Sequence, residues 1–385
     1  MIKKILFCCG LLSTLLIISC GGGGGGSSPA GTAPGAPIKV SVMSLTQTNS
    51  VYNMAVSDLN GDGLDDVVIS GWNKDVATAY LYVFVQNADG TLTDKTSTLL
   101  PNNIIKGSQR VLIADFDKDG NADIFVPGFD DGTQMYNENS VMFYGNAPNT
   151  AFTRQDWTDS SLAHGACAVD VNNDTYLDLI VAGSGVFINQ GSTSPRAYTL
   201  NTGILQNNYF TACAVTSNTL YLANNHSVPG YRDAILNLTN NTSTGYQSNN
   251  NYDTIDVVVS DLTGDGHPDF VLSLNGINVP DPGPREILAY TAPNTYTYLT
   301  TLESARSGYY GRGLTIGGIA SVFFSGDTNN ASVYQGTTKY KSADFINMAG
   351  TNNAFNPAEV YQNSNTGKIY MLQLIGNTFY TEEMQ

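Results

Sequence analysis

Short apolar segments recur along the chain, and turns rich in Gly, Asn and Asp separate many of them. Residues 54–57 alternate between larger apolar and small side chains, and residues 67–69 form a β-branched and aliphatic run. Alternation with a period of two and runs of β-branched residues are typical of strands that lie partly or fully within a core. The pattern predicts an all-β protein built from short strands and many turns.

Between two such strands, a nine-residue segment with one spacing rule occurs four times. Oxygen-bearing side chains stand at positions 1, 3, 5 and 9, and position 6 is Gly in three segments and Thr175 in the other. A loop that folds around an ion also offers the backbone carbonyl of position 7. At positions 1, 3, 5, 7 and 9 the four segments contain Asp58, Asn60, Asp62, Leu64 and Asp66; Asp115, Asp117, Asp119, Asn121 and Asp123; Asp170, Asn172, Asp174, Tyr176 and Asp178; and Asp261, Thr263, Asp265, His267 and Asp269.

This spacing predicts calcium-binding loops. Ca²⁺ takes six to eight oxygen ligands, and Gly at position 6 permits the sharp turn that brings alternate side chains together. An EF-hand begins in the same way, but it closes with Glu at position 12 and lies between helices, whereas these segments lie between strands. A turn stabilised by Asp and Asn without any metal is the alternative for a single loop. Four loops with one rule favour about four Ca²⁺ sites, and Thr175 and the neutral Thr263 are expected to weaken the third and fourth.

The starts of the loops predict the architecture. Carboxylate loops begin at 58, 115, 170 and 261, and the long last gap contains Thr216, where residues 213–216 repeat the strand of residues 167–170 without the loop. Two further starts, at Gly317 and Gln362, have lost the carboxylates, which makes seven starts at intervals of 45 to 57 residues. Repeats of this length favour a β-propeller with seven blades, each a four-stranded antiparallel sheet. Residues 38–42 are expected to supply the missing outer strand of the last blade.

Residues 56–71 and 113–128 carry a resemblance to a known family. With their loops and strands they resemble the FG-GAP/VCBS repeats of integrin α-subunit propellers and of many bacterial surface proteins. In that family the Asp-rich loop joins two strands of a blade and binds Ca²⁺. The resemblance implies ligand roles for the loop residues named above and covers most of residues 50–385.

The first twenty residues predict export and lipidation. Lys3 and Lys4 precede an apolar run at residues 5–18, which has the length of a signal-peptide core and is shorter than the roughly 20 residues of a membrane-spanning helix. Residues 16–20 read Leu-Ile-Ile-Ser-Cys and resemble the lipobox of bacterial lipoproteins, which implies acylation of Cys20. An ordinary secretory signal with an incidental cysteine is the alternative.

We therefore expect three segments. They are a lipoprotein signal peptide that ends at the lipidated cysteine (residues 1–20), a flexible Gly/Ser/Pro tether (21–37) and the propeller (38–385). A membrane contact through the N-terminal lipid follows, in a bacterial outer-membrane lipoprotein that faces the periplasm or the cell surface.

Composition excludes several classes of protein. The chain has 33 acidic and 17 basic residues, a net charge of -16, and is 42% hydrophobic. Intrinsic disorder requires low hydrophobicity, and nucleic-acid binding requires a basic surface, so no nucleic-acid partner is expected. Thirteen of the acidic residues occupy loop positions, three each in the first, third and fourth loops and four in the second. The acidity therefore reflects the loops more than an external partner.

Two cysteines remain after the signal segment, Cys167 and Cys213, in the matching contexts Ala-Cys-Ala-Val. Equivalent positions in neighbouring repeats would permit a disulfide in an oxidising compartment. A pair of small buried thiols is the interpretation that we favour from the sequence.

The sequence favours a binding or adhesion module for a glycan or protein partner. Residues 207–210 and 294–298 combine Tyr or Phe with Asn, which suits sugar recognition, although tyrosine is equally common as a strand residue. A lyase-like, polysaccharide-active enzyme and a subunit of an envelope assembly are the alternatives. His164, His226 and His267 share no spacing, and no hydrolase or phosphate-binding motif occurs. No catalytic residue is therefore predicted.

Overall fold

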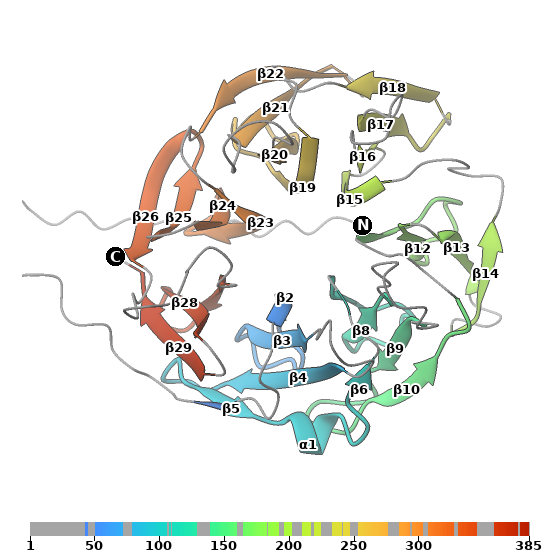
Figure 1. Cartoon of the computed structure of the whole chain (residues 1–385), viewed down its shortest axis with the longest axis vertical. Coiled ribbons are helices and arrows are strands. Elements are labelled where there is room, and N and C mark those ends of the chain that lie inside the picture. Colours follow the sequence, from blue (N-terminus) through green and yellow to red (C-terminus); the bar gives the residue numbers. More distant parts are fainter. Residues whose placement is uncertain are drawn as a thin grey trace, which may run out of the picture. The chain divides into compact units, whose positions relative to one another are not determined.

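The computed structural model contains strands in seven antiparallel sheets, arranged around a centre as the blades of a propeller (Figure 1). It describes residues 43–44, 51–71, 79–105, 108, 110–128, 139–159, 165–182, 184–191, 196–201, 210–216, 219–224, 233–240, 242–246, 253–275, 285–292, 295–302, 307–326, 330–344, 358–375 and 378–384. All of them belong to one compact unit, Pro37–Gln385. The predicted signal peptide, Cys20 and the tether lie outside the described residues. None of the helices in the described part is long and apolar enough to cross a bilayer.

The strands of the first four blades follow the chain in order. Blade 1 comprises β2 (Val51–Ser57), β3 (Asp66–Gly71), β4 (Ala79–Gln86) and β5 (Leu92–Asp94), with the helix α1 (Thr96–Leu99) and with β6 (Ile104–Ile105) paired to β4. Blade 2 comprises β7 (Leu112–Ala114), β8 (Asp123–Val126), β9 (Val141–Tyr144) and β10 (Thr153–Asp156). Blade 3 comprises β11 (Ala166–Val169), β12 (Asp178–Val181), β13 (Gly185–Asn189) and β14 (Tyr198–Asn201). Blade 4 comprises β15 (Phe210–Thr216), β16 (Thr219–Asn224), β17 (Asp233–Asn237) and β18 (Thr242–Tyr246).

The last three blades repeat the arrangement. Blade 5 comprises β19 (Asp253–Ser260), β20 (Asp269–Asn275), β21 (Arg285–Ala292) and β22 (Thr295–Thr301). Blade 6 comprises β23 (Ser307–Ile316), β24 (Ile319–Gly326), β25 (Asn330–Gln335) and β26 (Thr338–Asp344). Blade 7 comprises β27 (Ala358–Asn363), β28 (Lys368–Ile375) and β29 (Thr378–Glu383), and β1 (Met43–Ser44) is its fourth strand. The predicted seven blades of four-stranded antiparallel sheets are confirmed.

The propeller closes through pairing between the two ends of the described chain. Met43 lies opposite Phe379 and Ser44 lies opposite Thr378 in an antiparallel ladder. An N-terminal segment therefore completes the last blade, as expected, although the described pairs lie just beyond the segment 38–42 that we predicted for this role. Residues 38–42 themselves lie outside the described residues. Closure of this kind leaves no free sheet edge between the last blade and the first.

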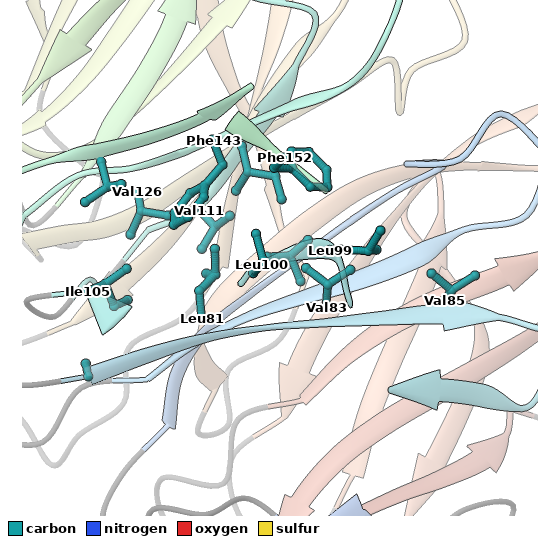
Figure 2. Packing of buried hydrophobic residues seen from close by; sticks show 14 residues of the cluster. Leu81, Val83, Val85, Leu99, Leu100, Ile105, Val111, Val126, Phe143 and Phe152 are labelled. Carbon is teal, nitrogen blue, oxygen red and sulfur yellow. The ribbon is translucent and has the colours of Figure 1, made fainter. Parts of the chain in front are cut away.

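Apolar clusters fill the interfaces between neighbouring blades. Val68, Val83 and Phe143 pack between blades 1 and 2 (Figure 2), whereas Val67, the neighbour of Val68 in β3, packs with Tyr361 between blades 1 and 7. Similar clusters lie at the five other interfaces around the propeller. Because successive side chains of a strand point to opposite faces, one central strand contributes to two interfaces. This is why the middle strands are apolar at consecutive positions.

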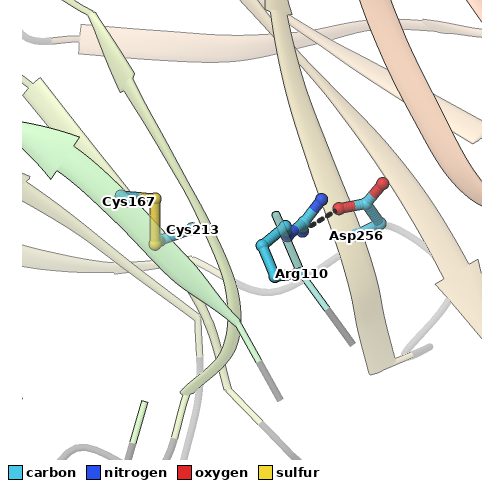
Figure 3. The surroundings of a disulfide bond; sticks show 4 residues. All are labelled: Arg110, Cys167, Cys213 and Asp256. Atoms are coloured by element: carbon cyan, nitrogen blue, oxygen red, sulfur yellow. Dashed lines mark hydrogen bonds and ion pairs between the residues drawn. A yellow bond between two sulfur atoms is a disulfide. The ribbon is translucent and has the colours of Figure 1, made fainter. Parts of the chain in front are cut away.

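The favoured interpretation of Cys167 and Cys213 as free thiols is wrong. They form a disulfide with a Cα–Cα distance of 6.0 Å (Figure 3). Cys167 lies in β11 and Cys213 in β15, the first strands of blades 3 and 4, and both belong to the apolar cluster between these blades. Equivalent positions in two neighbouring blades therefore face each other, which brings the sulfur atoms into bonding distance.

An ion pair between Arg110 and Asp256 joins two blades that are not neighbours. Arg110 precedes β7 of blade 2, and its Nη2 lies 2.7 Å from Oδ1 of Asp256 in β19 of blade 5 (Figure 3). The side chain of Asp256 is 1% exposed, and its Oδ2 accepts a hydrogen bond from the backbone N–H of Gly311 in β23 of blade 6. A single carboxylate thus connects three blades.

A second charged group lies where blades 6, 7 and 1 meet. Arg312 of β23 donates from Nη1 to the carbonyl oxygen of Val360, and its guanidinium lies 3.9 Å from Asp65 and 4.0 Å from Glu359. Burial raises the pKa of Glu359 from 4.5 to about 7, with smaller increases from Asp65 and Asp256 and an opposing decrease from Arg312. The folded protein therefore holds a proton on Glu359 over a range of pH in which an exposed Glu would be ionised.

Candidate metal centres

The four Asp-rich loops share one backbone conformation at position 6. The φ angle there is +83° at Gly63, +90° at Gly120, +85° at Gly266 and +77° at Thr175. A positive φ is readily adopted by Gly and is rare for a β-branched residue. The sharp turn predicted at position 6 is confirmed, and Thr175 is held in a strained conformation. The weaker metal binding expected of the third loop stays a prediction.

Position 4 also has a left-handed backbone in every loop, which the sequence did not reveal. The φ angle is +75° at Gly61, +60° at Lys118, +61° at Asn173 and +74° at Gly264. Glycine at this position in two of the four loops was the available signal. The loops therefore contain two left-handed turns each, and these turns direct the backbone N–H groups inward.

The carboxylate at position 1 accepts several of these inward N–H groups. Asp58 Oδ1 accepts a hydrogen bond from position 4 at 2.7 Å, and its Oδ2 accepts one from position 6 at 2.8 Å. Asp115, Asp170 and Asp261 accept the N–H of position 6 at 3.0, 2.7 and 3.0 Å. The first Asp therefore stabilises the fold of its loop through hydrogen bonds to the loop backbone.

Positions 3 and 5 form shorter-range contacts. The carboxylate at position 5 accepts the N–H of position 7 at 2.8 Å in all four loops, from Leu64 to Asp62, from Asn121 to Asp119, from Tyr176 to Asp174 and from His267 to Asp265. Asn60 and Asn172 at position 3 each accept the N–H of position 5 at 2.9 Å. Thr263, at position 3 of the fourth loop, is exposed. The ligand roles of the position-7 carbonyls stay predictions.

Position 9 has a structural role that the sequence did not indicate. The position-9 residues of the four loops are completely buried: Asp66, Asp123, Asp178 and Asp269. Asp66 Oδ2 accepts the N–H of Leu59 at 3.0 Å, and its Oδ1 accepts the N–H of Gln86 in β4 at 2.9 Å. The other three make the same pair of bonds, one to the start of their own loop and one to the third strand of the blade or the residue after it. Position 9 therefore joins the loop to the sheet.

Burial makes these position-9 carboxyl groups harder to ionise. It raises the pKa of Asp66 and of Asp123 to about 7 and that of Asp178 to about 6, and it raises the pKa of Asp269. The backbone hydrogen bonds act in the opposite direction, and neighbouring loop carboxylates add to the increase in the first three. Each site therefore combines a buried carboxyl group, whose ionised form a nearby cation would stabilise, with further oxygen donors, which is the donor chemistry that suits a hard cation.

A family comparison identifies these repeats. Residues 41–126, which contain the first two loops, match the family model described as FG-GAP-like repeat. The first blades of this propeller contain FG-GAP-like repeats. The resemblance recognised from the loop spacing is thus confirmed, together with the fold that it implied.

Other comparisons concern the propeller fold alone. No curated protein matches the chain. Two solved structures of BBS1N in complex with ARL6DN, one soaked with mercury and one with lead, are similar to this propeller at 10% and 9% sequence identity. Each match covers 88% of this chain and 93% of the other, with TM-scores of 0.48 and 0.53.

The second loop of the propeller has the most concentrated carboxylate set in the described part of the chain. One oxygen atom each of Asp115, Asp117 and Asp123 lies within 4.8 Å of the other two. Carboxylate oxygens at this mutual distance can contact one ion. Although Asp123 accepts two backbone hydrogen bonds, a carboxylate has about four lone-pair positions and retains capacity for a metal. The second loop therefore fits Ca²⁺ well.

A guanidinium already lies beside this second loop. Arg196 Nε donates to Asp117 Oδ2 at 2.6 Å, and its Nη2 lies 3.8 Å from Asp119. The same side chain lies over the ring of Tyr144, 4.5 Å from its centroid. Arg196 belongs to blade 3, so a cation from the neighbouring blade partly balances the charge of the loop.

Blades 6 and 7 have tight turns where the carboxylate loops stand in other blades. Gly317 and Gly318, with φ angles of +59° and +80°, join β23 to β24, and a short turn that contains Gly367 joins β27 to β28. The corresponding residues 217–218 of blade 4 lie outside the described residues. The predicted loss of the loops is confirmed in blades 6 and 7.

Proposed function

We propose that this protein is an extracytoplasmic binding module whose propeller is stabilised by Ca²⁺ and tethered to the bacterial outer membrane through lipid on Cys20. The partner in this proposal is a glycan or a protein. The observation that carries the calcium part is the common geometry of the four loops, which adopt the same left-handed turns at positions 4 and 6. Asp and Asn turns alone need no such agreement among four distant segments.

In each loop the side chains at positions 1, 3, 5 and 9 and the carbonyl at position 7 would hold the ion. Bound Ca²⁺ supplies positive charge that offsets the loop carboxylates, and its binding free energy adds to the free energy of folding. Since the ligands come from a single loop, few coordination positions stay open for a substrate. This favours a structural role for the metal over a catalytic one.

The disulfide supports the proposed location. Cys167 and Cys213 are both buried, 6% exposed each, and bonded within the interface of two blades. Structural disulfides persist in the periplasm and outside the cell and are rare in the reducing cytosol. This agrees with the export signal and the lipobox-like segment at residues 16–20.

The fold supports a binding role. Seven packed interfaces make a rigid ring, and the outer strands and turns present side chains at its surface. Binding sites commonly lie on exposed segments that a rigid scaffold positions. Among the sequence-predicted aromatic residues, Tyr298 is 40% exposed in β22, whereas Tyr296 packs against the buried ring of Phe270 at 4.6 Å.

Calcium content and thermal unfolding test the metal. Protein purified with Ca²⁺ is expected to contain about four ions and to melt at a higher temperature than protein in excess chelator. Asp115→Asn with Asp117→Asn should remove part of the difference. Asp89→Asn is the matched control, because Asp89 accepts hydrogen bonds in an exposed turn outside the four loops. Equal melting temperatures with and without chelator, in protein without bound calcium, would refute the calcium proposal.

Membrane fractionation tests the anchor. Cys20→Ser is expected to move the protein from the membrane fraction to the soluble extracytoplasmic fraction and to abolish incorporation of labelled fatty acid. Retention of the variant in the membrane with undiminished labelling would contradict lipidation at Cys20.

A further inference from the structure

A pocket of about 630 Å³ lies between blades 2 and 3, and none of the carboxylates of the Asp-rich loops lines it. Its wall begins with the end of β10 and continues through residues 157–159. The opposite wall comes from β13 and β14 of blade 3. Ligand sites in proteins commonly have volumes of about 300–1,000 Å³, so the pocket has room for a small molecule.

Three aromatic side chains line the pocket and pack against one another. The ring of Trp157 lies 5.1 Å from that of Phe187 and 5.0 Å from that of Tyr198. Trp157 also contacts the buried Phe125 of β8 at 5.1 Å. Tyr198 is held in turn, because its hydroxyl accepts a hydrogen bond from Asn189. These rings form a rigid apolar surface on which a flat ligand face can stack.

The segment that carries Trp157 is fixed by hydrogen bonds to Ser140, the residue that precedes β9. The backbone N–H of Trp157 donates to the carbonyl oxygen of Ser140 at 2.9 Å. Asp159 accepts the N–H of Ser140 at 2.9 Å and its hydroxyl at 2.6 Å. The indole therefore has a defined position before any ligand arrives, which lowers the entropic cost of binding.

Two polar atoms of the pocket residues have no hydrogen-bond partner in the described structure. They are the indole Nε1 of Trp157, whose side chain is 9% exposed, and the Oγ of Ser184. Both residues line the pocket. A buried donor without a partner is unfavourable. Because this nitrogen is enclosed, a ligand oxygen reaches the indole N–H through a small shift of the side chain, and the hydrogen bond then formed removes this cost.

The charges of the pocket select among ligands. Asp156 and Asp159 line it, and Arg154 pairs with Asp156 through an Nη2–Oδ1 contact of 2.5 Å. The two carboxylates disfavour an anion. A quaternary ammonium group would suit aromatic rings and carboxylates, but it offers no acceptor to the indole N–H. A hydroxyl both donates and accepts, so it can satisfy the carboxylates, the indole and Ser184 together.

We propose that this pocket binds a neutral pyranose sugar, with its apolar face on the aromatic rings and its hydroxyls on Trp157 Nε1, Ser184 and the two carboxylates. The proposal rests on the proposed binding role and assigns that role a place and a ligand class. The Asp-rich loops take no part in the contact.

Binding of single sugars tests the assignment. The probes are the methyl glycosides of glucose, galactose, mannose, fucose and N-acetylglucosamine, with tetramethylammonium chloride and sodium acetate for comparison. The chain has two tryptophans, so Trp72→Phe leaves Trp157 as the single emitter. At least one glycoside is expected to change its fluorescence in a saturable manner, and calorimetry on the wild-type protein should give the same dissociation constant.

Variants locate the site. Leu200 lines the pocket and is 46% exposed, so Leu200→Arg should fill it and weaken sugar binding by at least about ten-fold. Leu299→Arg is the matched control, because Leu299 is also 46% exposed but lies on β22 of blade 5. Loss of one hydrogen bond in Trp157→Phe or Ser184→Ala should weaken binding about ten-fold by calorimetry. The exposed Ser243→Ala on β18 should leave it unchanged.

The outcomes separate this inference from the proposed function. Binding of no glycoside in the panel, or binding of tetramethylammonium or acetate instead, overturns the sugar assignment. A glycoside whose affinity falls equally in Leu200→Arg and Leu299→Arg overturns the pocket while the general binding role stands. The calcium-dependent melt is measured on the same samples and reports on the metal proposal independently.

Discussion

Reduction of the Cys167–Cys213 disulfide is expected to lower the free energy of unfolding by about 4 kcal/mol. The two cysteines are 46 residues apart in the sequence, and the chain-entropy relation for a loop of that length gives about 13 cal/mol/K, or about 4 kcal/mol at 25 °C. With an unfolding entropy of about 2.1 cal/mol/K per residue, a unit of about 350 residues should lose about 5 °C of melting temperature.

Three samples distinguish the effect of the bond from the effect of packing. They are the oxidised protein, the same protein reduced with a phosphine, and the variant Cys167→Ala with Cys213→Ala. Denaturant unfolding should place the reduced protein below the oxidised one, and the double variant lower still, because alanine also removes buried sulfur atoms. Mass spectrometry after alkylation checks the redox state. Identical unfolding midpoints for the oxidised and reduced proteins would refute the reasoning.

Three further predictions concern charged side chains. In excess chelator, Asp66→Ala should lower the free energy of unfolding by about 2–4 kcal/mol in denaturant titrations, because two buried N–H groups lose their acceptor. The control Asp62→Ala, in the same loop, should lower it by less than about 1 kcal/mol. Arg196→Gln should tighten calcium binding measured by calorimetry, because it removes a positive charge beside the second loop; unchanged calcium affinity would contradict this. Folding raises the pKa of Glu359 from 4.5 to about 7. The stabilisation that comes from its bound proton is therefore fully present below about pH 4.5 and is lost as the pH rises through about 7. Glu359→Gln should therefore be more stable than the wild type at pH 8, by up to about 3 kcal/mol in denaturant unfolding, and equal to it at pH 4; a constant difference at both pH values would refute it.

Short-range pattern accounts for what could be predicted of the fold. The period-two strands, the spacing of the Asp-rich loops and the repeat of 45 to 57 residues are local or periodic features, and they led to seven blades, including blades 6 and 7, which have lost the carboxylate loop. The turn at position 6 was predictable for the same reason, because glycine marks a left-handed backbone wherever it recurs at one place in a repeat.

The sequence alone determined the blade count, the loop residues and the FG-GAP resemblance. Only the tertiary structure decided how distant strands meet. Cys167 and Cys213 form a disulfide because equivalent positions of neighbouring blades face each other. In the tertiary structure, Asp66 and its counterparts are buried and join the loop to the sheet. In the first, second and fourth loops, the backbone N–H that each Asp accepts belongs to the third strand of the blade or the residue after it, about 20 residues along the chain. The pocket around Trp157 likewise forms from two blades. Contacts between residues far apart in sequence depend on the packing of whole sheets, and no local spacing encodes them.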